Sequence, residues 1–302
     1  MEKRKKKNDA LKRTGNAFGI VSLCVLLLYV ISFIAPFVWA LITSVRDPLD
    51  YIIGGGFVPQ DWGMEGVWKN NYEVVFKNFF VRVLVLDGSF RSVKLGEMAF
   101  NSIAYALGSA VFSMLACLLT AYIAAIFKFK MCDWIYAVVI IQMIIPIVGS
   151  LPSELRMAHA LGLDDSIPGM WIMKTYVTGL YFLVFYGSFK LIPKDYAEAA
   201  QLDGAGNFRI MVNIMFPFVK GSIFTVTLLR FITFWNDYQT PLLYMPTHPT
   251  LAYGLYHFTR GSNNSDTPTQ LAACILMAIP LFAVFVAFQK RLLGDLTIGG
   301  LK

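Results

Sequence analysis

The residues best placed to do chemistry in this 302-residue chain are charged side chains set inside apolar runs. Arg230 lies near the middle of one such run and Asp237 toward its end, with Thr233 and Phe234 between them. Seven residues of helix at about 1.5 Å each would separate Arg230 from Asp237 by roughly 10 Å, too far for a direct ion pair. Ionisable groups in apolar helices usually face a cavity or a partner. We therefore predict that these residues share one helical face, which either lines a pore or packs against another subunit.

Gln142 and Pro146 interrupt a second apolar run in a similar way. Proline removes a backbone donor and is a common cause of helix kinks. We expect a structural kink at this position.

A polar, alanine-rich segment, PKDYAEAAQLDGAGNFRIMVNIMFP at 193 to 217, separates two other apolar runs. Pro193 suits the first turn of a helix. Gly204 accepts the left-handed conformation that ends helices, and Asn207 can cap a second short helix through Met215. Pro217 then starts the next apolar run.

Spacing alone leaves two interpretations of this segment open, an ordinary amphipathic loop and a helix-turn-helix. In the second reading one helical face carries little bulk, with Tyr196, Ala199, Ala200 and Asp203 at i, i+3, i+4 and i+7.

The elements that must position these residues are membrane helices. The chain is 57% hydrophobic and 15% charged, which leaves too little polar surface for a soluble globule of this size. Apolar runs of about 20 residues are long enough to cross a bilayer. We predict an all-α integral membrane protein with six spans, at 19 to 42, 100 to 127, 134 to 151, 170 to 189, 217 to 244 and 270 to 288.

The distribution of basic residues predicts the orientation. Seven of the 26 Lys and Arg residues lie within the first thirteen positions, so the net charge of +7 reads as a membrane orientation signal and not as a nucleic-acid surface. With six spans, both termini are expected in the cytoplasm. The first apolar run is about 24 residues long and lacks a small-x-small cleavage pattern, so we expect it to remain as a helix rather than act as a cleaved signal. The four cysteines show no C-x-x-C spacing and are expected to be free thiols.

Motifs for catalysis are absent from the sequence. The glycines at 54 to 56 are not followed by Lys-Ser/Thr, and the chain contains no H-E-x-x-H, G-x-S-x-G or metal-ligand cluster. We expect no catalytic residue, no metal site and no nucleotide site in this chain.

The longest stretch outside the predicted spans runs from 43 to 99. Its run NNYEVVFKNFFVRVLVL, at 70 to 86, is amphipathic and rich in aromatic residues. Such segments lie in the membrane interface. We expect a shallow structural helix on the outer face, with a docking surface for an outside partner as the alternative.

The residue types of the polar segment identify a protein family more specifically than their spacing does. Glu198-Ala199-Ala200, then Asp203-Gly204-Ala205, then Pro217 resembles the EAA loop of permease subunits of bacterial ABC importers. Further positions are similar to the carbohydrate-uptake branch, in particular the second permease of the maltose type: Pro59, Asn71-Tyr72, Phe100-Asn101-Ser102, Trp235-Asn236-Asp237 and the ending Gly299-Gly300-Leu301-Lys302. Residues 78 to 94 are longer than the family pattern.

This resemblance implies a type I ABC importer permease fold, with a cytoplasmic tail at 1 to 18 and a permease domain at 19 to 302. The loop at 190 to 216 would couple the pore to a separate ATPase. The implied partners are two ATPase subunits that bind the ATP, a second permease, an extracytoplasmic binding protein and a carbohydrate. The resemblance also implies that the chain lies in a lipid bilayer, that it binds no nucleic acid and that it holds no cofactor of its own. The implied coupling residues are Tyr196, Glu198, Ala199, Ala200, Asp203, Gly204 and Ala205. The candidate pore residues are Arg230, Phe234, Trp235, Asn236 and Asp237, with Phe234 or Trp235 stacking on a sugar ring.

Other functions remain open at this point. The importer could carry another solute, such as a phosphate ester or a modified sugar. A secondary transporter working alone commonly has internal repeats and two broken helices at matching positions, and the sequence displays neither. A membrane anchor or receptor would not need a coupling loop.

The predicted topology can be tested by labelling single cysteines in a variant that lacks the four native ones. A cysteine at Asn263 should react with a membrane-impermeant maleimide in sealed cells, because this residue falls in a predicted outer loop. A cysteine at Asn207 should react only after the membrane is opened. Labelling of position 207 in sealed cells would contradict the topology.

Overall fold

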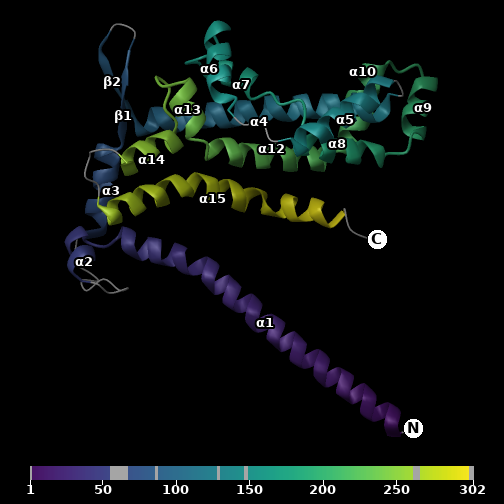
Figure 1. Cartoon of the computed structure of the whole chain (residues 1–302), viewed down its shortest axis with the longest axis horizontal. Helices are drawn as coiled ribbons and strands as arrows, with labels where there is room; N and C mark the ends of the chain where they lie inside the picture. Colours follow the sequence, from purple (N-terminus) through teal and green to yellow (C-terminus); the bar gives the residue numbers. More distant parts are fainter. Residues whose placement is uncertain are drawn as a thin grey trace. The chain divides into compact units, whose positions relative to one another are not determined.

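A computed structural model describes residues 2–54, 67–85, 88–127, 130–145, 149–260 and 266–298. In these ranges the chain is helical apart from one β-hairpin (Figure 1). It divides into two compact units, residues 1–78 with 264–276 and residues 79–263 with 277–302.

The smaller unit joins the end of the first helix to three other segments. Its elements are α1 (Glu2–Ser44), α2 (Pro48–Ile53), α3 (Val67–Asn78) and the first part of α15 (Thr267–Ile298). The last carbonyls of a helix lack partners within the helix. The Asn71 amide of α3 donates to the carbonyls of Ser44 and Arg46, at 2.9 and 2.8 Å, and the Thr269 hydroxyl donates to Asn71 at 3.4 Å. Asn71 therefore holds the end of α1 in place.

The larger unit is built around α4 (Leu95–Ile126). The buried residues of α4 recur every three or four positions, and many of them are Ala, Ser or Cys. Small side chains on one helical stripe let other helices approach closely. Against α4 pack α5 (Lys130–Ile144), α7 (Ile167–Met173), α8 (Leu180–Lys190), α12 (Lys220–Trp235) and α14 (Leu251–Arg260).

Two polar side chains near the start of α4 hold the beginning of α14. The Asn101 amide donates to the Pro249 carbonyl at 3.0 Å, and the Ser102 hydroxyl accepts from the Leu251 backbone N–H at 2.7 Å. An N–H group of the first helical turn has no partner within its helix, and Ser102 supplies one. These bonds give a physical role to the Asn-Ser pair of the family resemblance.

The functional elements lie at the two ends of α4. At one end are α9 (Asp195–Leu202) and α10 (Asn207–Ile210), followed by the π-helical turn η1 (Met211–Met215) and α11 (Phe216–Phe218). At the other end are α13 (Gln239–Tyr244), α14 and the hairpin, with α6 (Leu151–Ala160) nearby (Figure 1). At about 1.5 Å per residue, the 32 residues of α4 separate these ends by roughly 48 Å.

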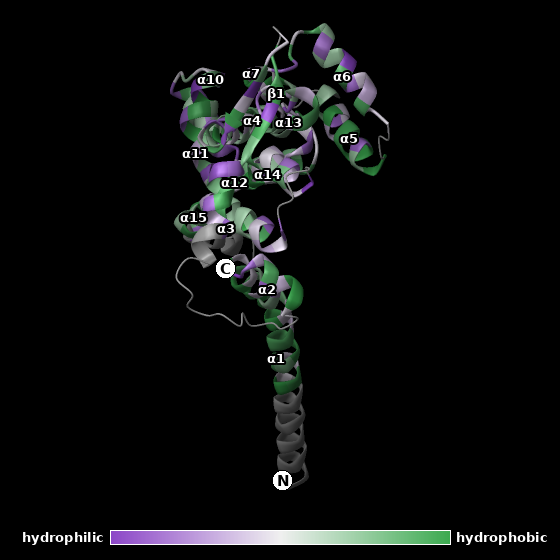
Figure 2. Cartoon of the chain, turned by 90° about the vertical axis from the view of Figure 1, so that its left-hand side faces the viewer, coloured by the Kyte–Doolittle hydropathy of each residue, from purple (hydrophilic) through white to green (hydrophobic). Residues whose placement is uncertain are grey.

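Within the described part of the chain, three helical segments are long and apolar enough to cross a membrane: Gly19–Ser44, Leu95–Ile126 and Thr267–Gln289. The apolar part of α1 is coloured as hydrophobic in Figure 2, and its side chains between Ile20 and Leu41 are mostly exposed. A fourth span results if the pair 207–218 and 220–235, bent by 77°, counts as one. The helical membrane fold is thus confirmed.

Three of the six predicted spans do not form single long helices. The run 217 to 244 is divided, because α12 ends at Trp235 and α13 begins at Gln239. The run 134 to 151 forms the shorter helix α5, which ends at Ile144, and Pro146 of the predicted kink lies outside the described residues. The run 170 to 189 is broken by a non-helical linker at 174–179, between α7 and α8. Gly179 in this linker has φ +107°, a conformation that favours glycine.

The prediction for the amphipathic run at 70 to 86 was wrong in its second half. Its first half lies in α3, but residues Phe80–Leu84 form strand β1, which pairs antiparallel with β2 (Phe90–Lys94). The alternation of valine with other residues has the period of a strand and buries Val81, Val83 and Val93 on one face. Pro59 and the ending Gly299–Lys302 lie outside the described residues.

The contact between α4 and α7 can be tested at Gly108. A Cβ at this position would overlap the indole of Trp171, whose N–H donates to the Ala104 carbonyl at 3.0 Å. Gly108→Ala should therefore lower the free energy of unfolding by about 1–3 kcal/mol, measured by thermal unfolding of the purified protein. The matched control is Gly96→Ala in the same helix, where a Cβ meets nothing within 4 Å. Equal stability of the two variants would contradict this packing.

Candidate functional site

The segment between α8 and α12 contains a tight turn that ends α9. Gly204 has φ +81°, as the sequence predicted. The Gly204 N–H donates to the Gln201 carbonyl at 3.0 Å, and the Ala205 N–H donates to the Ala200 carbonyl at 2.9 Å. This pair of bonds defines a Schellman motif, which usually includes an apolar contact between the two residues of the longer bond. Ala200 and Ala205 both pack in the same hydrophobic core. The string Ala200 to Ala205 thus encodes a rigid turn.

The predicted low-bulk face of α9 is mostly exposed. Ala200 is buried, and Ala197 packs partly buried against the same core. Of the other predicted members of the face, Ala199 and Asp203 are exposed, and Tyr196 is half-exposed with its ring 4.9 Å from that of Phe218. Only Ala200 of the predicted face is therefore buried.

The outward side of this turn carries apolar side chains. Leu202 at the end of α9 is 90% exposed, and Phe208 in α10 is 75% exposed. Glu198 is also exposed, and no described carboxylate-binding side chain lies within ion-pair distance of it. We call Leu202, Gly204 and Phe208 the tip of the turn. Exposed apolar side chains in a polar segment are typical of docking sites.

Three details of this segment differ from the sequence prediction. Pro193 precedes α9, which begins at Asp195. Gly206 stands at the N-cap of α10, so that Asn207 is its first residue. The apolar helix α12 begins at Lys220, and Pro217 lies in the preceding α11.

The second site lies around the linker at 174–179. The Cys117 thiol of α4 donates to the Tyr176 carbonyl at 2.9 Å, and the Thr178 hydroxyl donates to the Gln142 side chain of α5. Backbone groups freed by a break in a membrane helix need such partners. The linker is thus tied to α4 and α5 in one conformation.

Arg230 of α12 lies between two tyrosine rings. Its guanidinium carbon is 5.5 Å from the ring centre of Tyr176 and 4.5 Å from that of Tyr181, distances at which a cation is attracted to an aromatic face. Its Nε is buried without a hydrogen-bond partner. Arg230 therefore faces the linker.

The other candidate pore residues separate from Arg230. Helix α12 ends at Trp235, so the prediction that Asp237 shares a helical face with Arg230 was wrong. Phe234 is buried with its ring 5.9 Å from that of Tyr105, and Trp235 is buried with its ring 5.6 Å from that of Phe231. Neither ring offers an open face in this chain. The exposed Asn236 amide donates to a backbone carbonyl of its own helix at 2.9 Å.

A polar cavity of about 240 Å³ adjoins the linker on the side away from α9. Charged and hydroxyl groups from α6, the linker and α13 line it, together with three methionines: Glu154, Met157, Met170, Met173, Lys174, Tyr176, Thr240 and Tyr244. The Tyr244 hydroxyl donates to Glu154 at 3.3 Å. Tyr176 lines the cavity and also stacks on Arg230, so this ring connects the cavity lining to Arg230, which is not itself part of that lining.

Asp165 holds the two walls of this cavity together. Its backbone N–H donates to the Tyr244 carbonyl at 2.6 Å, and its carboxylate accepts from the backbone and the hydroxyl of Thr247, at 3.0 and 2.7 Å. These bonds support its positive φ of 50°, which is uncommon outside glycine. The connection between α6 and α7 is thereby fixed to the segment after α13.

The histidines do not form a metal site. His159 and Asp164 share a hydrogen bond of 2.9 Å, which raises the pKa of His159 and lowers the pKa of Asp164. Both side chains are well exposed, so the pair contributes little to stability. Among the residues that the structure describes, no group of three or more His, Cys, Asp or Glu could hold a metal ion. The cysteines are free thiols, as predicted.

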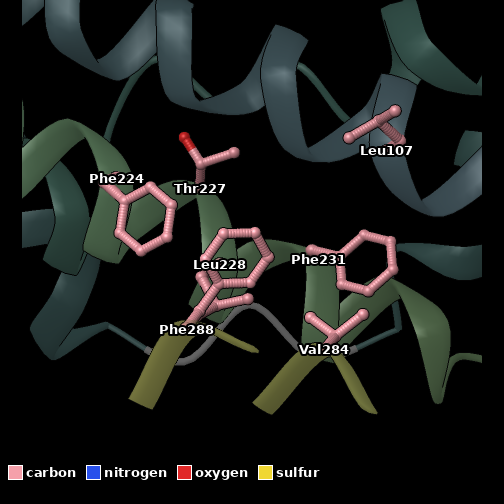
Figure 3. Close-up of a pocket in the computed structure, with 7 residues that line it drawn as sticks. All are labelled: Leu107, Phe224, Thr227, Leu228, Phe231, Val284 and Phe288. Carbon is pink, nitrogen blue, oxygen red and sulfur yellow. The ribbon is translucent and has the colours of Figure 1, made fainter. Parts of the chain in front are cut away.

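A second cavity, of about 250 Å³, lies between α4, α12 and α15 (Figure 3). Its described lining is apolar except for Thr227, whose hydroxyl donates to the Ile223 carbonyl at 2.7 Å: Leu107, Phe224, Thr227, Leu228, Phe231, Val284 and Phe288. A polyhydroxylated ligand would lose its hydrogen bonds to water here without replacement. This cavity is unsuited to a polar solute.

Sequence reasoning missed Lys174 and Tyr176 of the linker, Tyr181 of α8 and Glu154 of α6. The signal was the string KTYVTG at 174 to 179, where Lys, Thr and Gly interrupt an apolar run. Polar residues next to glycine in a membrane segment indicate a broken helix. The sequence analysis instead predicted one continuous span from 170 to 189, which includes this break.

The fold and the two sites define a helical permease subunit of the inner membrane, with a rigid turn at one end and a polar site toward the other. The chain belongs to the family described as the binding-protein-dependent transport system inner membrane component, which matches residues 117–296, more than half of the chain.

Relatives with known roles extend this similarity to nearly the whole chain. The permease protein of a diacetylchitobiose uptake system from Streptomyces coelicolor is 24% identical over 288 residues, covering 93% of this chain and 88% of that protein. The melibiose, raffinose and stachyose import permease of Bacillus subtilis is 26% identical over 271 residues, covering 88% and 91%. The crystal structure of a bacterial ABC transporter that imports the acidic polysaccharide alginate contains a chain with the same fold, with a TM-score of 0.74, 20% identity, and coverage of 92% of this chain and 97% of that one.

Proposed function

We propose that this chain is a translocation subunit of an ATP-driven importer for a sugar or an oligosaccharide. Its family supports the importer, and the saccharide substrates of its two relatives support the solute class. The observation that carries the proposal is the rigid turn at Gly204 with exposed Leu202 and Phe208, because a transport subunit without its own ATPase needs a docking element of this kind.

The energy source in this proposal is a separate protein. ATP would bind to two cytoplasmic ATPase subunits, and this chain would contribute neither a catalytic residue nor a cofactor. A second permease would complete the pore, and an extracytoplasmic binding protein would deliver the sugar. Both termini of this chain would lie in the cytoplasm.

Coupling would follow the chain from the docked turn to the polar site. When the ATPases close, they would move α9 and α10. The segment 207–218 meets α12 at a 77° bend, so a displacement of the turn would act on α12 as a lever. Arg230 lies in α12 against Tyr176 of the linker and Tyr181 of α8. Movement of α12 would therefore change access to the polar cavity, which is the basis of alternating access.

Docking can be tested by replacing the exposed apolar residues of the tip. Leu202→Ser and Phe208→Ser should each weaken copurification of the ATPase at least tenfold, because burial of such a side chain contributes about 1.5–3 kcal/mol. The matched control is Phe90→Ser in β2, which is 74% exposed against 75% for Phe208. If the control reduced ATPase recovery as much as Phe208→Ser, the loss would not come from docking.

Gly204 and Glu198 test the turn itself. Gly204→Val should abolish transport and substrate-stimulated ATP hydrolysis together, because a side chain at positive φ costs about 1 kcal/mol or more and would also meet the partner. Asparagine adopts this backbone conformation more readily than valine. Gly204→Asn therefore separates the effect of backbone strain from the effect of a side chain colliding with the partner. Glu198→Lys should weaken docking while membrane insertion stays normal. Retention of coupled hydrolysis in the purified Gly204→Val, Glu198→Lys complex would refute the coupling role.

A further inference from the structure

The charge of Arg230 is not balanced by a carboxylate of this chain. Across the described ranges, neither Arg230 nor Lys174 lies within ion-pair distance of an Asp or Glu side chain. A cation in the interior of a membrane protein is costly and usually has a partner. The guanidinium also has a buried Nε without a hydrogen bond. Arg230 therefore needs an anion from outside this chain.

The carboxylates near the site already have donors. Asp237 accepts from the Tyr105 hydroxyl at 2.8 Å and from the Thr240 backbone N–H at 3.0 Å. Glu154 accepts from the Tyr244 hydroxyl at 3.3 Å. Because hydrogen bonds hold both carboxylates beside α4 and α13, they do not reach Arg230.

The tyrosines place the guanidinium for planar recognition. Tyr176 and Tyr181 lie at 5.5 and 4.5 Å from its carbon, so they restrict its motion. The guanidinium fork matches the geometry of a carboxylate, with which it forms two parallel charge-assisted hydrogen bonds. Tyr176 is 43% exposed and also lines the polar cavity, where its ring can contact an apolar sugar face.

Lys174 adds a second cation to the same site. It lines the cavity together with Tyr176, and the single acidic residue in the described lining is Glu154. With Arg230 behind Tyr176, two cations lie beside this tyrosine, and the two nearby carboxylates, Glu154 and Asp237, already accept hydrogen bonds from tyrosine hydroxyls. The site is thus electrostatically suited to an anion and its sugar ring.

We propose that the solute carried past this chain is an acidic saccharide whose carboxylate binds Arg230, with Lys174 as a second contact on its route. This inference rests on the proposed function and adds the charge of the substrate to it. Neutral saccharides would leave Arg230 without an anion and would be carried poorly.

The test uses the complete importer, purified through a tag on this chain and reconstituted in liposomes with its binding protein. The probes are uronic-acid oligosaccharides, each paired with its carboxyl-reduced form, which has the same linkages but no charge. The wild-type importer should take up an acidic probe at least tenfold more efficiently than its neutral counterpart. Arg230→Gln should raise the half-saturation concentration for the acidic probe about ten- to a hundredfold, the usual effect of losing a charged hydrogen-bond pair, and affect the neutral probe much less.

Two further variants sharpen the result. Lys174→Gln should cause a smaller loss that is again confined to the acidic probe, and it decides the question if Arg230→Gln does not insert. Arg260→Gln is the matched control, because that guanidinium lies 5.4 Å from the ring centre of Tyr256 in α14, outside the site. It should change neither probe.

Three outcomes would overturn the proposal. If neutral probes enter and acidic ones do not, the substrate is uncharged, although the importer function stands. If Arg230→Gln releases the second permease from the complex, a carboxylate of that subunit is the missing anion. If no saccharide of either kind enters, the proposed function fails, and the inference fails with it.

Discussion

The arrangement of the larger unit depends on the burial of one face of α4. Fifteen of its residues are buried, at helical spacing, and the small ones among them let α8 and α12 lie close to it. These two helices carry Tyr181 and Arg230. Since the same stripe also contacts α7 and α14, a single helix positions elements from both ends of the site.

Breaks in the helices create the polar site within this packing. The linker at 174–179 turns Tyr176 toward α12, and the end of α12 at Trp235 lets Asp237 turn back toward Tyr105. At the linker, the Cys117 thiol of α4 donates to the freed Tyr176 carbonyl, and the Gln142 side chain of α5 accepts from the Thr178 hydroxyl. Non-helical backbone is tolerated at membrane depth when it is buried in protein or lines a cavity. Polar function and helix interruption therefore occur together in this chain.

The turn at Gly204 follows a different logic, because local backbone chemistry determines it. The bonds of the Schellman motif join residues that are close in sequence, and the two alanines add an apolar contact on the inside. A turn made in this way keeps its shape while its outer surface meets another protein. The exposed Leu202 and Phe208 are then available for that contact without loss of the fold.

The sequence alone determined features that depend on composition and on short-range geometry. Apolar content indicated a helical membrane protein, and Gly204 after Asp203 indicated the left-handed turn, because few other residues adopt a positive φ. The strand at Phe80–Leu84 had a visible alternating pattern, but an aromatic amphipathic run was read as a helix. Tertiary structure alone decided that Phe234 and Trp235 are buried, that Ala200 rather than Ala199 packs inward, and that Tyr176 and Tyr181 enclose Arg230. The physical reason is that the contacts of Arg230 with the tyrosines and of Phe234 with Tyr105 join residues far apart in the sequence. Their approach depends on how α8 and α12 pack on α4 and not on the preferences of either segment.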